Sequence, residues 1–404
     1  MRDSSVGRYL GGLDGLRGLA CLAVLFAHSL AHFAPITTPA GVAQVLAQGL
    51  TVFFAMSGML IYTPFVRDIA NGSRRLDLRR YARRRLLRVY PVYLAIFLIV
   101  DFGLRAVYVT NAVDTSTPGT DSGTGMMTDP GPVLLNLSLL QTFFPDTVQT
   151  GVNPSWSLTT ELTFYALLPI LALPLVGRFG GNRRIALALV PPGVLLVAGL
   201  AGRAWAEHLY RGRTDLTPFS AEFGANGVAV LSRSLLGLAD NFALGMIVAV
   251  LFVWTERAEL PWWTRRRAAV TGWTLFAAGG VVGLLLRDAH PWFMGTATSV
   301  SAAALILLVV DPSARRESSK LVRFAGFRPI GYVGEISLSV YLWHYPMIVI
   351  ATRTGIFADD GIVSMVGSPL LVALVSIALG AATFTFIERP AMSGRIRLRR
   401  EVSP

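Results

Sequence analysis

Arginine and histidine recur along one apolar segment near the N-terminus, LDGLRGLACLAVLFAHSLAHF. Arg17 and His28 are eleven residues apart. This is close to three helical turns, so both side chains point the same way, about 16 Å apart along the axis. Asp14 and His32 extend the same stripe. Ionisable groups are costly in a membrane and are kept where they face a polar channel or a catalytic groove. A neutral imidazole accepts a proton near neutral pH, which makes His28 the leading candidate for a base.

These four residues also have structural interpretations. His28 could be a packed polar side chain, and Arg17 could reach a lipid phosphate at the membrane boundary. Asp14, one turn from Arg17, favours an ion pair instead. His28 and His32 have the i, i+4 spacing of a metal pair, but no helical carboxylate or cysteine accompanies them, so we predict no metal site. We expect His32 to be solvated or to line the external mouth.

A second group lies in PSWSLTTELTFYALLP. Trp156 would stand at the outer boundary of a membrane helix, with Glu161 just inside it. Glu161 could simply favour the helix dipole from the first turns. Alternatively, it could orient or charge-stabilise the imidazole of His28, with both groups in the outer half of the membrane. We include Trp156 and Tyr165 among the candidate residues of a substrate cavity.

A third group is RRYARRRLLRVYPVY, where Arg85 and Arg88 are three residues apart and share a helix face. Guanidinium forks of this kind suit phosphates. Arginines at a membrane boundary also set topology and bind lipid headgroups. We therefore expect only two or three of the nine arginines between residues 67 and 88 to bind a ligand.

Three further stretches complete the candidates. In GEISLSVYLWHYPMIV, His344 is either a second cavity residue or a structural histidine in an aromatic cage. In FTFIERP, Glu388 is expected to pair with a nearby arginine as a structural clasp. Ser57, in FFAMSGMLI, is a further candidate for the cavity.

The composition defines the kind of protein that positions these groups. The chain has 404 residues, of which 53% are hydrophobic and 15% charged, and its mean hydropathy is +0.55. A soluble domain is less apolar and more charged, so we predict an all-α polytopic membrane protein. The net charge of +12 comes from arginine clusters between apolar runs. Such clusters set topology, and we predict no nucleic-acid partner.

Runs of about 20 apolar residues give ten expected transmembrane helices. Basic and non-basic connections alternate, which places both termini and the 67–88 loop in the cytoplasm and the 106–156 connection outside. The 203–228 connection fits least well, because it would place three arginines outside. The expected helices are 13–33, 42–65, 88–109, 157–176, 184–202, 229–254, 268–287, 293–311, 334–352 and 365–387.

The chain is expected to be one membrane domain, residues 1–404, with a basic cytoplasmic tail at 391–404. Asp14 and Arg17 interrupt the first apolar run, so we do not expect a cleaved signal peptide. The single Cys21 cannot form an internal disulfide. The segment 110–156 is too polar to pack as a core and is interpreted as a slack tether or a lid.

Five stretches in this order resemble the acyltransferase family 3 membrane proteins, over about residues 8–390. In that family the first helix carries arginine, ten residues, then histidine, a spacing that Arg17 and His28 meet. FFAMSGMLI resembles its FF-x-x-SG-x-LI helix, and RLLRVYP its R-x-x-R-x-YP segment. YLWHYP and IERP are similar to its last two helices. One departure is TTELTFY, where the family often has paired glutamates and this chain has only Glu161.

The resemblance implies transfer of an acyl group, usually acetyl, from acyl-coenzyme A to a hydroxyl of a sugar, envelope glycan, lipid headgroup or macrolide. It also implies that the protein lies in the cell membrane of a bacterium. On that basis Arg85, Arg88 and Arg17 would hold the coenzyme's phosphates. His28 would deprotonate the acceptor hydroxyl or carry the acyl group itself, with Glu161 or Asp14 orienting its ring.

A transporter with a His/Glu/Arg proton pathway is the alternative, because it too places ionisable groups at membrane depth. The chain lacks a half-chain repeat and a matched pair of broken helices, which count against it. The sequence leaves the acceptor, the acyl chain length and the oligomeric state open.

Overall fold

The computed structural model describes residues 4–74, 76–111, 118–177, 183–257, 263–310 and 320–393. Among them, nine helices are long and apolar enough to cross a membrane, or ten if the bent pair Arg328–Glu335 and Ser337–Thr354 is one span. The all-helical fold with about ten spans is therefore confirmed. Arg178, Arg315 and Arg316, which belong to the arginine clusters between apolar runs, and the part of the expected tail from residue 394 lie outside the described residues.

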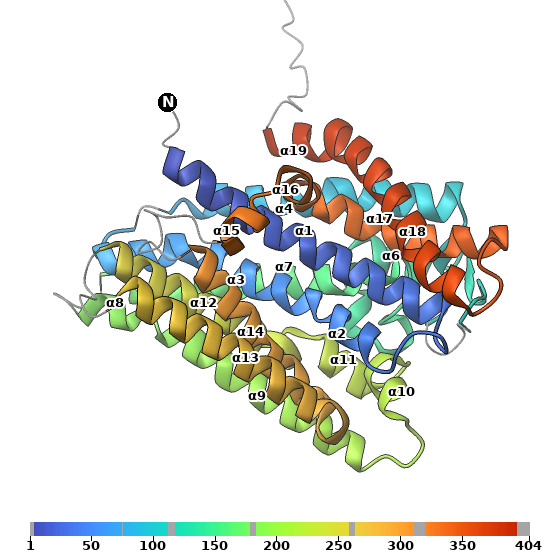
Figure 1. The fold of residues 1–404 in the computed structure, drawn as a ribbon, viewed down its shortest axis with the longest axis horizontal. Coiled ribbons are helices and arrows are strands. Elements are labelled where there is room, and N and C mark those ends of the chain that lie inside the picture. Colours follow the sequence, from blue (N-terminus) through green and yellow to red (C-terminus); the bar gives the residue numbers. More distant parts are fainter. Residues whose placement is uncertain are drawn as a thin grey trace, which may run out of the picture.

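The helices and strands follow in chain order (Figure 1). The first half contains α1 (Ser4–Phe33), α2 (Val42–Ala47), α3 (Gly49–Asn71), α4 (Leu78–Leu98), β1 (Val107–Tyr108), β2 (Thr124–Gly125), α6 (Pro130–Leu137) and α7 (Trp156–Ala172). The second half contains α8 (Arg183–Leu187), α9 (Val190–Arg211), α10 (Pro218–Phe223), α11 (Gly227–Arg233), α12 (Leu235–Glu256), α13 (Arg265–Ala289), α14 (Pro291–Val310), α15 (Lys320–Ala325), α16 (Arg328–Glu335), α17 (Ser337–Thr354), α18 (Ile362–Thr383) and α19 (Arg389–Ser393).

Helix α1 lies between two groups of helices (Figure 1). On one side it packs against α16, α17 and α18, and on the other against α3 and α14. Its first half contributes Leu13 and Leu16 to one hydrophobic cluster, and its second half contributes Val24 and Leu25 to the other. Polar residues on α1 are therefore placed where the two halves of the bundle meet.

Glycines allow two close helix contacts that position the site. A Cβ on Gly58 of α3 would lie 2.1 Å from the carbonyl oxygen of Phe242, and one on Gly245 of α12 would lie 1.8 Å from that of Ala55. Small residues let membrane helices approach this closely. The contact fixes α3, and with it Ser57, against α12. Helices α1 and α16 meet in the same way, since a Cβ on Gly334 would lie 1.7 Å from the carbonyl oxygen of Asp14.

The third expected helix, 88–109, differs most from the structure. Helix α4 begins at Leu78, where Asp77 caps it by accepting hydrogen bonds from the backbone N–H groups of Arg79 and Arg80. It continues into a π-helical turn, Ile99–Gly103. The stretch from residue 78 to 88 is rich in arginine and therefore too polar to be recognised as part of a membrane helix. The cap at Asp77 nevertheless starts the helix there. Residues 107 and 108 form β1 instead.

The 203–228 connection also needed correction. Helix α9 extends to Arg211, so Arg203 is a helical residue and not a loop arginine. Its guanidinium is buried and bonded to Asp240 at 2.9 Å and to Asn241 at 3.0 Å, both on α12. A buried, paired arginine does not indicate which side of the membrane a loop faces. Arg203 therefore no longer counts among the three arginines that the predicted topology placed outside.

The polar 110–156 segment packs where it is described, so of its two expected alternatives, a slack tether or a lid, the slack tether was wrong for residues 118–156. Its amide and hydroxyl side chains are buried because they bond to one another. Asn136 donates to Thr150 at 3.0 Å, and Gln141 donates to Ser155 at 3.0 Å. Arg353 of α17 holds the segment from outside by donating to Asp121 at 2.9 Å. Residues 112–117 lie outside the described part of the chain.

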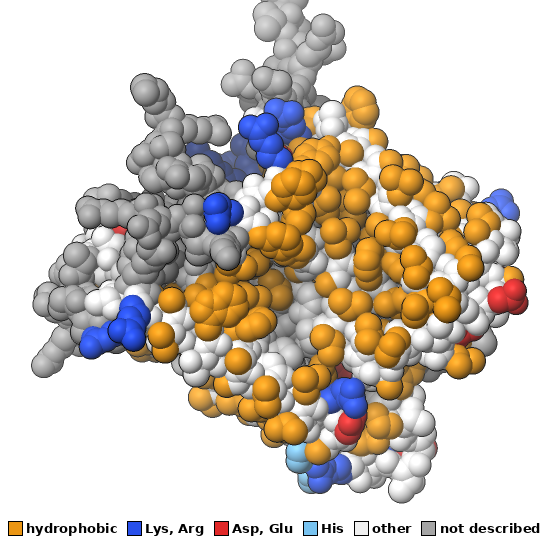
Figure 2. Space-filling model, in the orientation of Figure 1, with side chains coloured by type: hydrophobic (Ala, Val, Ile, Leu, Met, Phe, Trp, Pro, Cys, Tyr) orange, Lys and Arg blue, Asp and Glu red, His pale blue; other side chains and the backbone are white. Residues whose placement is uncertain are grey.

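The bundle has two distinguishable ends. At the basic end, α3 ends, α4 begins, and Arg67 pairs with Glu256 at 2.9 Å. At the opposite end, α7 and α12 begin and the 118–156 segment packs. Between the ends, hydrophobic side chains cover much of the face seen in Figure 2, with lysine and arginine at its margins. Exposed apolar residues of this kind include Leu285, Val363, Leu370 and Leu374.

Candidate active site

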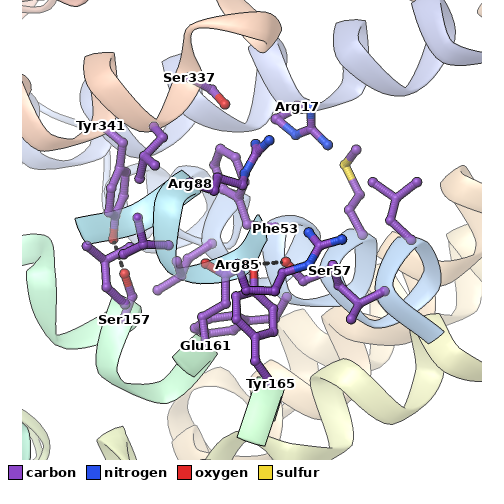
Figure 3. A pocket seen from close by; sticks show the side chains of 18 residues that line it. Arg17, Phe53, Ser57, Arg85, Arg88, Ser157, Glu161, Tyr165, Ser337 and Tyr341 are labelled. Carbon is purple, nitrogen blue, oxygen red and sulfur yellow. Dashed lines mark hydrogen bonds between the residues drawn. The ribbon is translucent and has the colours of Figure 1, made fainter. Parts of the chain in front are cut away.

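A pocket with an empty volume of about 840 Å³, counted to its open mouth, lies where α1, α3, α4, α7 and α17 meet (Figure 3). Three arginines and one glutamate line it, so its charge is positive. Its polar lining residues are Arg17, Ser57, Arg85, Arg88, Ser157, Glu161, Tyr165, Ser337 and Tyr341.

The three arginines come from two helices that are distant in sequence. Arg17 lies on α1, whereas Arg85 and Arg88 lie on one face of α4, and all three side chains border the pocket (Figure 3). Arg85 packs between the rings of Tyr81 and Tyr165, with its guanidinium carbon 5.8 and 5.6 Å from their centroids. Its buried Nε has no partner among the described residues. A group of guanidinium donors with a free N–H favours an anionic ligand.

Glu161 does not contact His28. It accepts hydrogen bonds from Ser57 Oγ of α3 and from Tyr165 one turn further along α7, both at 2.5 Å. Helix α7 packs against α3, α4 and α12, and this packing directs Glu161 to Ser57 rather than to α1. The carboxylate is therefore the counter-charge of the arginine pocket, and it does not orient the imidazole as we had considered.

Asp14 pairs with Arg17 at 2.9 Å, one turn apart on α1. The ion pair was the interpretation favoured over lipid binding, and it is confirmed. The same pair excludes Asp14 from orienting His28, which lies almost four helical turns further along α1. Asp14 instead fixes the Arg17 side chain at the edge of the pocket.

The pocket ends at Tyr341 of α17 and Ser157 of α7, whose hydroxyl oxygens lie 3.1 Å apart (Figure 3). Neither residue was among the sequence candidates. Tyr341 stands three residues before His344 in YLWH, so the two share a helix face, and their ring centroids are 5.4 Å apart. That i, i+3 spacing was the signal that could have identified Tyr341.

His28 and His344 lie beyond Tyr341, toward the opposite end. Neither lines the arginine pocket. His28 Nδ1 is 2.8 Å from His344 Nε2, and the two rings stack with centroids 5.1 Å apart. His344 Nδ1 contacts the carbonyl oxygen of Tyr341. Helices α1 and α17 run parallel here, since Cys21, His28 and His32 meet successive positions of α17.

These contacts determine the tautomer of each ring when both are neutral. A carbonyl oxygen only accepts, so His344 Nδ1 carries a hydrogen and His344 Nε2 is an acceptor. His28 Nδ1 must then donate to it, which leaves the lone pair of His28 Nε2 available. No described residue hydrogen-bonds that nitrogen. An imidazole oriented through one nitrogen, with the other free, has the arrangement of a general base.

Other sequence candidates lie outside the pocket. His32 is buried and 2.8 Å from Thr352 Oγ1, so the first of its two expected alternatives, a solvated residue, was wrong. Glu388 accepts a hydrogen bond from Ser339 at 2.8 Å, and among the described residues no arginine is bonded to it. Trp156 packs instead against Arg233 of α11, whose guanidinium carbon is 4.4 Å from the Trp156 ring. Arg233 was not among the sequence candidates.

Two tyrosines cover the histidine pair on the side away from the arginine pocket. The Tyr345 ring lies 5.3 Å from that of His28, and the Tyr108 ring of β1 lies 5.8 Å from that of Tyr345. Burial raises the pKa of Tyr108 well above its usual range, so its hydroxyl stays protonated at physiological pH. The β1 segment therefore contributes a neutral, aromatic cap above His28.

Fold and site together define a polytopic membrane protein with an arginine-lined pocket next to a buried histidine pair. Residues 10–387 match the family described as an acyltransferase domain. The chain therefore belongs to the acyltransferase 3 family and is a membrane O-acetyltransferase homologue. This decides against the transporter alternative.

Curated relatives carry the same assignment. The chain is 27% identical over 397 residues to YrhL of Bacillus subtilis, provisionally named a peptidoglycan O-acetyltransferase. It is 24% identical over 391 residues to the O-acetyltransferase OatA of Staphylococcus aureus, and 24% over 394 residues to the peptidoglycan O-acetyltransferase OatA of Listeria monocytogenes. These matches cover 95% of this chain but only 55%, 57% and 56% of the relatives, so the chain spans about half their length. No solved structure matches it.

Proposed function

We propose that this protein transfers an acetyl group from acetyl-coenzyme A, bound from the basic end, to a hydroxyl of a cell-envelope glycan that enters from the opposite end. The basic end would face the cytoplasm, as the arginine clusters favour. The observation that carries the proposal is the hydrogen-bonded chain from the Tyr341 carbonyl through His344 to His28, directly beyond the arginine pocket.

The pocket supports binding of the donor. Arg17, Arg85 and Arg88 present guanidinium groups to one space, and the buried Nε of Arg85 lacks a partner among the described side chains. Phosphate oxygens would satisfy these donors. Glu161 limits the repulsion between the arginines in the absence of ligand. The donor supplies the thioester, and the three arginines would hold its phosphates.

The histidine pair supports the proton transfer. His28 Nε2 would take the proton of the acceptor hydroxyl as its oxygen attacks the thioester carbonyl carbon. The new carbon–oxygen bond forms, the carbon–sulfur bond breaks, and the departing thiolate takes the proton back from His28. His344 would hold the imidazole in the required tautomer and share the charge that develops on it.

Tyr341 connects the two parts. Its side chain borders the pocket, and its carbonyl holds His344. The thioester would reach His28 past this ring when its contact with Ser157 opens. Tyr341 is therefore a positioning residue in the proposal.

The experiment is an acetyl-transfer assay on the purified chain in nanodiscs, with radiolabelled acetyl-coenzyme A and solubilised peptidoglycan fragments. His28→Ala should lose transfer and keep coenzyme A binding, measured by equilibrium dialysis. His32→Gln is the matched control, since His32 is one turn away on the same helix and bonds only to Thr352 among the described residues. Full transfer by His28→Ala would overturn the proposal.

A further inference from the structure

A buried arginine with free donors lies at the opposite end of the bundle. The Arg233 side chain is 6% exposed. Its guanidinium carbon lies 3.9 Å from the Phe223 ring centroid and 4.4 Å from that of Trp156, so it is held between two aromatic faces. Cation–π contact stabilises the charge but uses none of the five N–H donors.

The free donors of Arg233 form one edge. Nη1 lies 3.5 Å from Glu222 Oε1, a long contact to a carboxylate that is 42% exposed. Nε and Nη2 are buried and have no partner among the described residues. In a guanidinium, the N–H bonds of Nε and Nη2 point the same way, and this edge binds the two oxygens of a carboxylate or phosphate.

Arg203, a buried arginine of the same bundle, provides a comparison because its donors are paired. Its Nε bonds to Asp240 at 2.9 Å and its Nη2 to Asn241 at 3.0 Å, while Nη1 donates to the carbonyl of Trp292. The edge that is satisfied in Arg203 is vacant in Arg233. Buried donors of a charged group are destabilising when they are unpaired, so such an edge favours a ligand.

The position of Arg233 relates it to the acceptor. Arg233 ends α11 just before α12 begins, at the end of the bundle opposite the arginine pocket. Thr160 of α7 anchors its backbone by donating to the Arg233 carbonyl at 2.5 Å. Its guanidinium packs on Trp156, and the next residue, Ser157, has its hydroxyl 3.1 Å from that of Tyr341, so Arg233 lies close to the reacting region.

We propose that the Nε/Nη2 edge of Arg233 binds an oxyanion of the acceptor, a carboxylate or a phosphate, and thereby places the acceptor hydroxyl near His28. This inference rests on the proposed function. It makes the enzyme selective for acidic glycans over neutral ones of the same length.

The test compares three acceptors in the nanodisc assay. They are an oligosaccharide of alternating N-acetylglucosamine and N-acetylmuramic acid with free lactyl carboxylates, its methyl ester, and a phosphorylated chitotetraose. For the wild type, the KM of the carboxylate or of the phosphate acceptor should be about tenfold to a hundredfold below that of the ester, as expected for a charge-assisted pair. The acidic acceptor with the lower KM shows whether Arg233 binds a carboxylate or a phosphate.

Arg233→Lys keeps the charge but not the edge, and should raise the KM of the acidic acceptor about tenfold without changing that of the ester. Glu222→Gln removes the competing carboxylate and should lower the KM of the acidic acceptor, a gain that misfolding cannot produce. Arg213→Gln, in an exposed pair with Asp215 at 2.6 Å, is the matched control.

The two proposals fail differently. Wild-type transfer with equal KM for acid and ester, or an equal rise for both in Arg233→Lys, would overturn the role of Arg233 alone. No transfer to any of the three acceptors by wild-type protein that binds acetyl-coenzyme A would overturn the proposed function.

Discussion

His28 on α1 and His344 on α17 share a hydrogen bond of 2.8 Å between Nδ1 of the first ring and Nε2 of the second, although 316 residues separate them. The bond holds because α1 and α17 run parallel and the rings stack at an interplanar angle of 6°. It directs the remaining nitrogen of His28 away from His344. The pair is therefore asymmetric, with His28 poised to react and His344 to support it.

Loss of His344 tests this asymmetry. His344→Phe keeps an aromatic ring beside Tyr341 but removes the acceptor for His28, so kcat should fall about a hundredfold or more while the KM for acetyl-coenzyme A stays unchanged. His344→Gln should retain more activity, because its amide oxygen can accept the same hydrogen. Steady-state kinetics with labelled donor measures both, and an unchanged kcat in His344→Phe would contradict the asymmetry.

The donor site makes a separate prediction. Arg88→Gln or Arg85→Gln should raise the KM for acetyl-coenzyme A about tenfold, the value of one lost charge-assisted hydrogen bond, with a smaller effect on the acceptor KM. Arg67→Gln is the control, because Arg67 lies at the same end and pairs with Glu256. A similar rise in the control would mean that the arginines act through overall charge alone.

Glu161 should matter for stability as well as for the charge of the pocket. In Glu161→Ala, the hydroxyls of Ser57 and Tyr165 lose their acceptor, so the free energy of unfolding should fall by about 3 kcal/mol. Ser57→Ala removes a single donor and should cost about 1 kcal/mol. Thermal unfolding of the solubilised protein gives the order of the variants. Equal stability of Glu161→Ala and wild type would show that the buried contacts contribute nothing.

The close contact of α3 and α12 predicts a strong size limit. Gly245→Val would place a side chain against the Ala55 carbonyl, and should cost about 3 kcal/mol and most of the folded protein. Gly331→Ala in α16 meets no atom within 4 Å and should be neutral or slightly stabilising. Size-exclusion chromatography of the two variants checks this. A monodisperse Gly245→Val protein at wild-type yield would disprove the contact.

A loop contact predicts a pH response. A hydrogen bond from the Thr37 side chain, together with the backbone N–H groups of Ile36 and Thr37 at 2.7 and 2.9 Å, holds the pKa of Asp360 below its usual value. A lowered pKa means that the contact is present above the ordinary aspartate pKa and is lost as the pH falls through the folded value. Hydrogen exchange should show the protection of Ile36 and Thr37 decreasing at pH 3, and already absent at pH 6 in Asp360→Asn. Equal protection in wild type and Asp360→Asn at pH 6 would rule out this contact.

The helices could be predicted because long apolar runs identify membrane spans with little ambiguity. All ten expected ranges have helical counterparts. The largest differences are in the third, where α4 begins ten residues earlier than expected, at Leu78 after the cap at Asp77, and ends eleven residues earlier, at Leu98 before the π-helical turn. Arg17, Arg85 and Arg88 were also predicted to act together, from the three-residue spacing of Arg85 and Arg88 and from the resemblance to the family. The structure places all three around one pocket.

The partners of each polar group could not be predicted, because they depend on which helices are neighbours. Glu161 was considered as the residue that orients His28, but α7 packs on α3, and Glu161 therefore accepts a hydrogen bond from Ser57 instead. The sequence left open whether His344 is a structural or a cavity residue. Its contact with His28 depends on α1 and α17 being parallel neighbours, which the sequence does not show. Arg233 gave no signal at all, since a single arginine after an apolar stretch has the pattern of a topology marker.

The most direct test of the central claim uses proteoliposomes that separate donor from acceptor. With the basic end outward, radiolabelled acetyl-coenzyme A is added only outside and the glycan acceptor is sealed inside. Labelled glycan should accumulate in the lumen with wild type and not with His28→Ala. Acetylation only when donor and acceptor share the same compartment would contradict transfer across the bundle through His28.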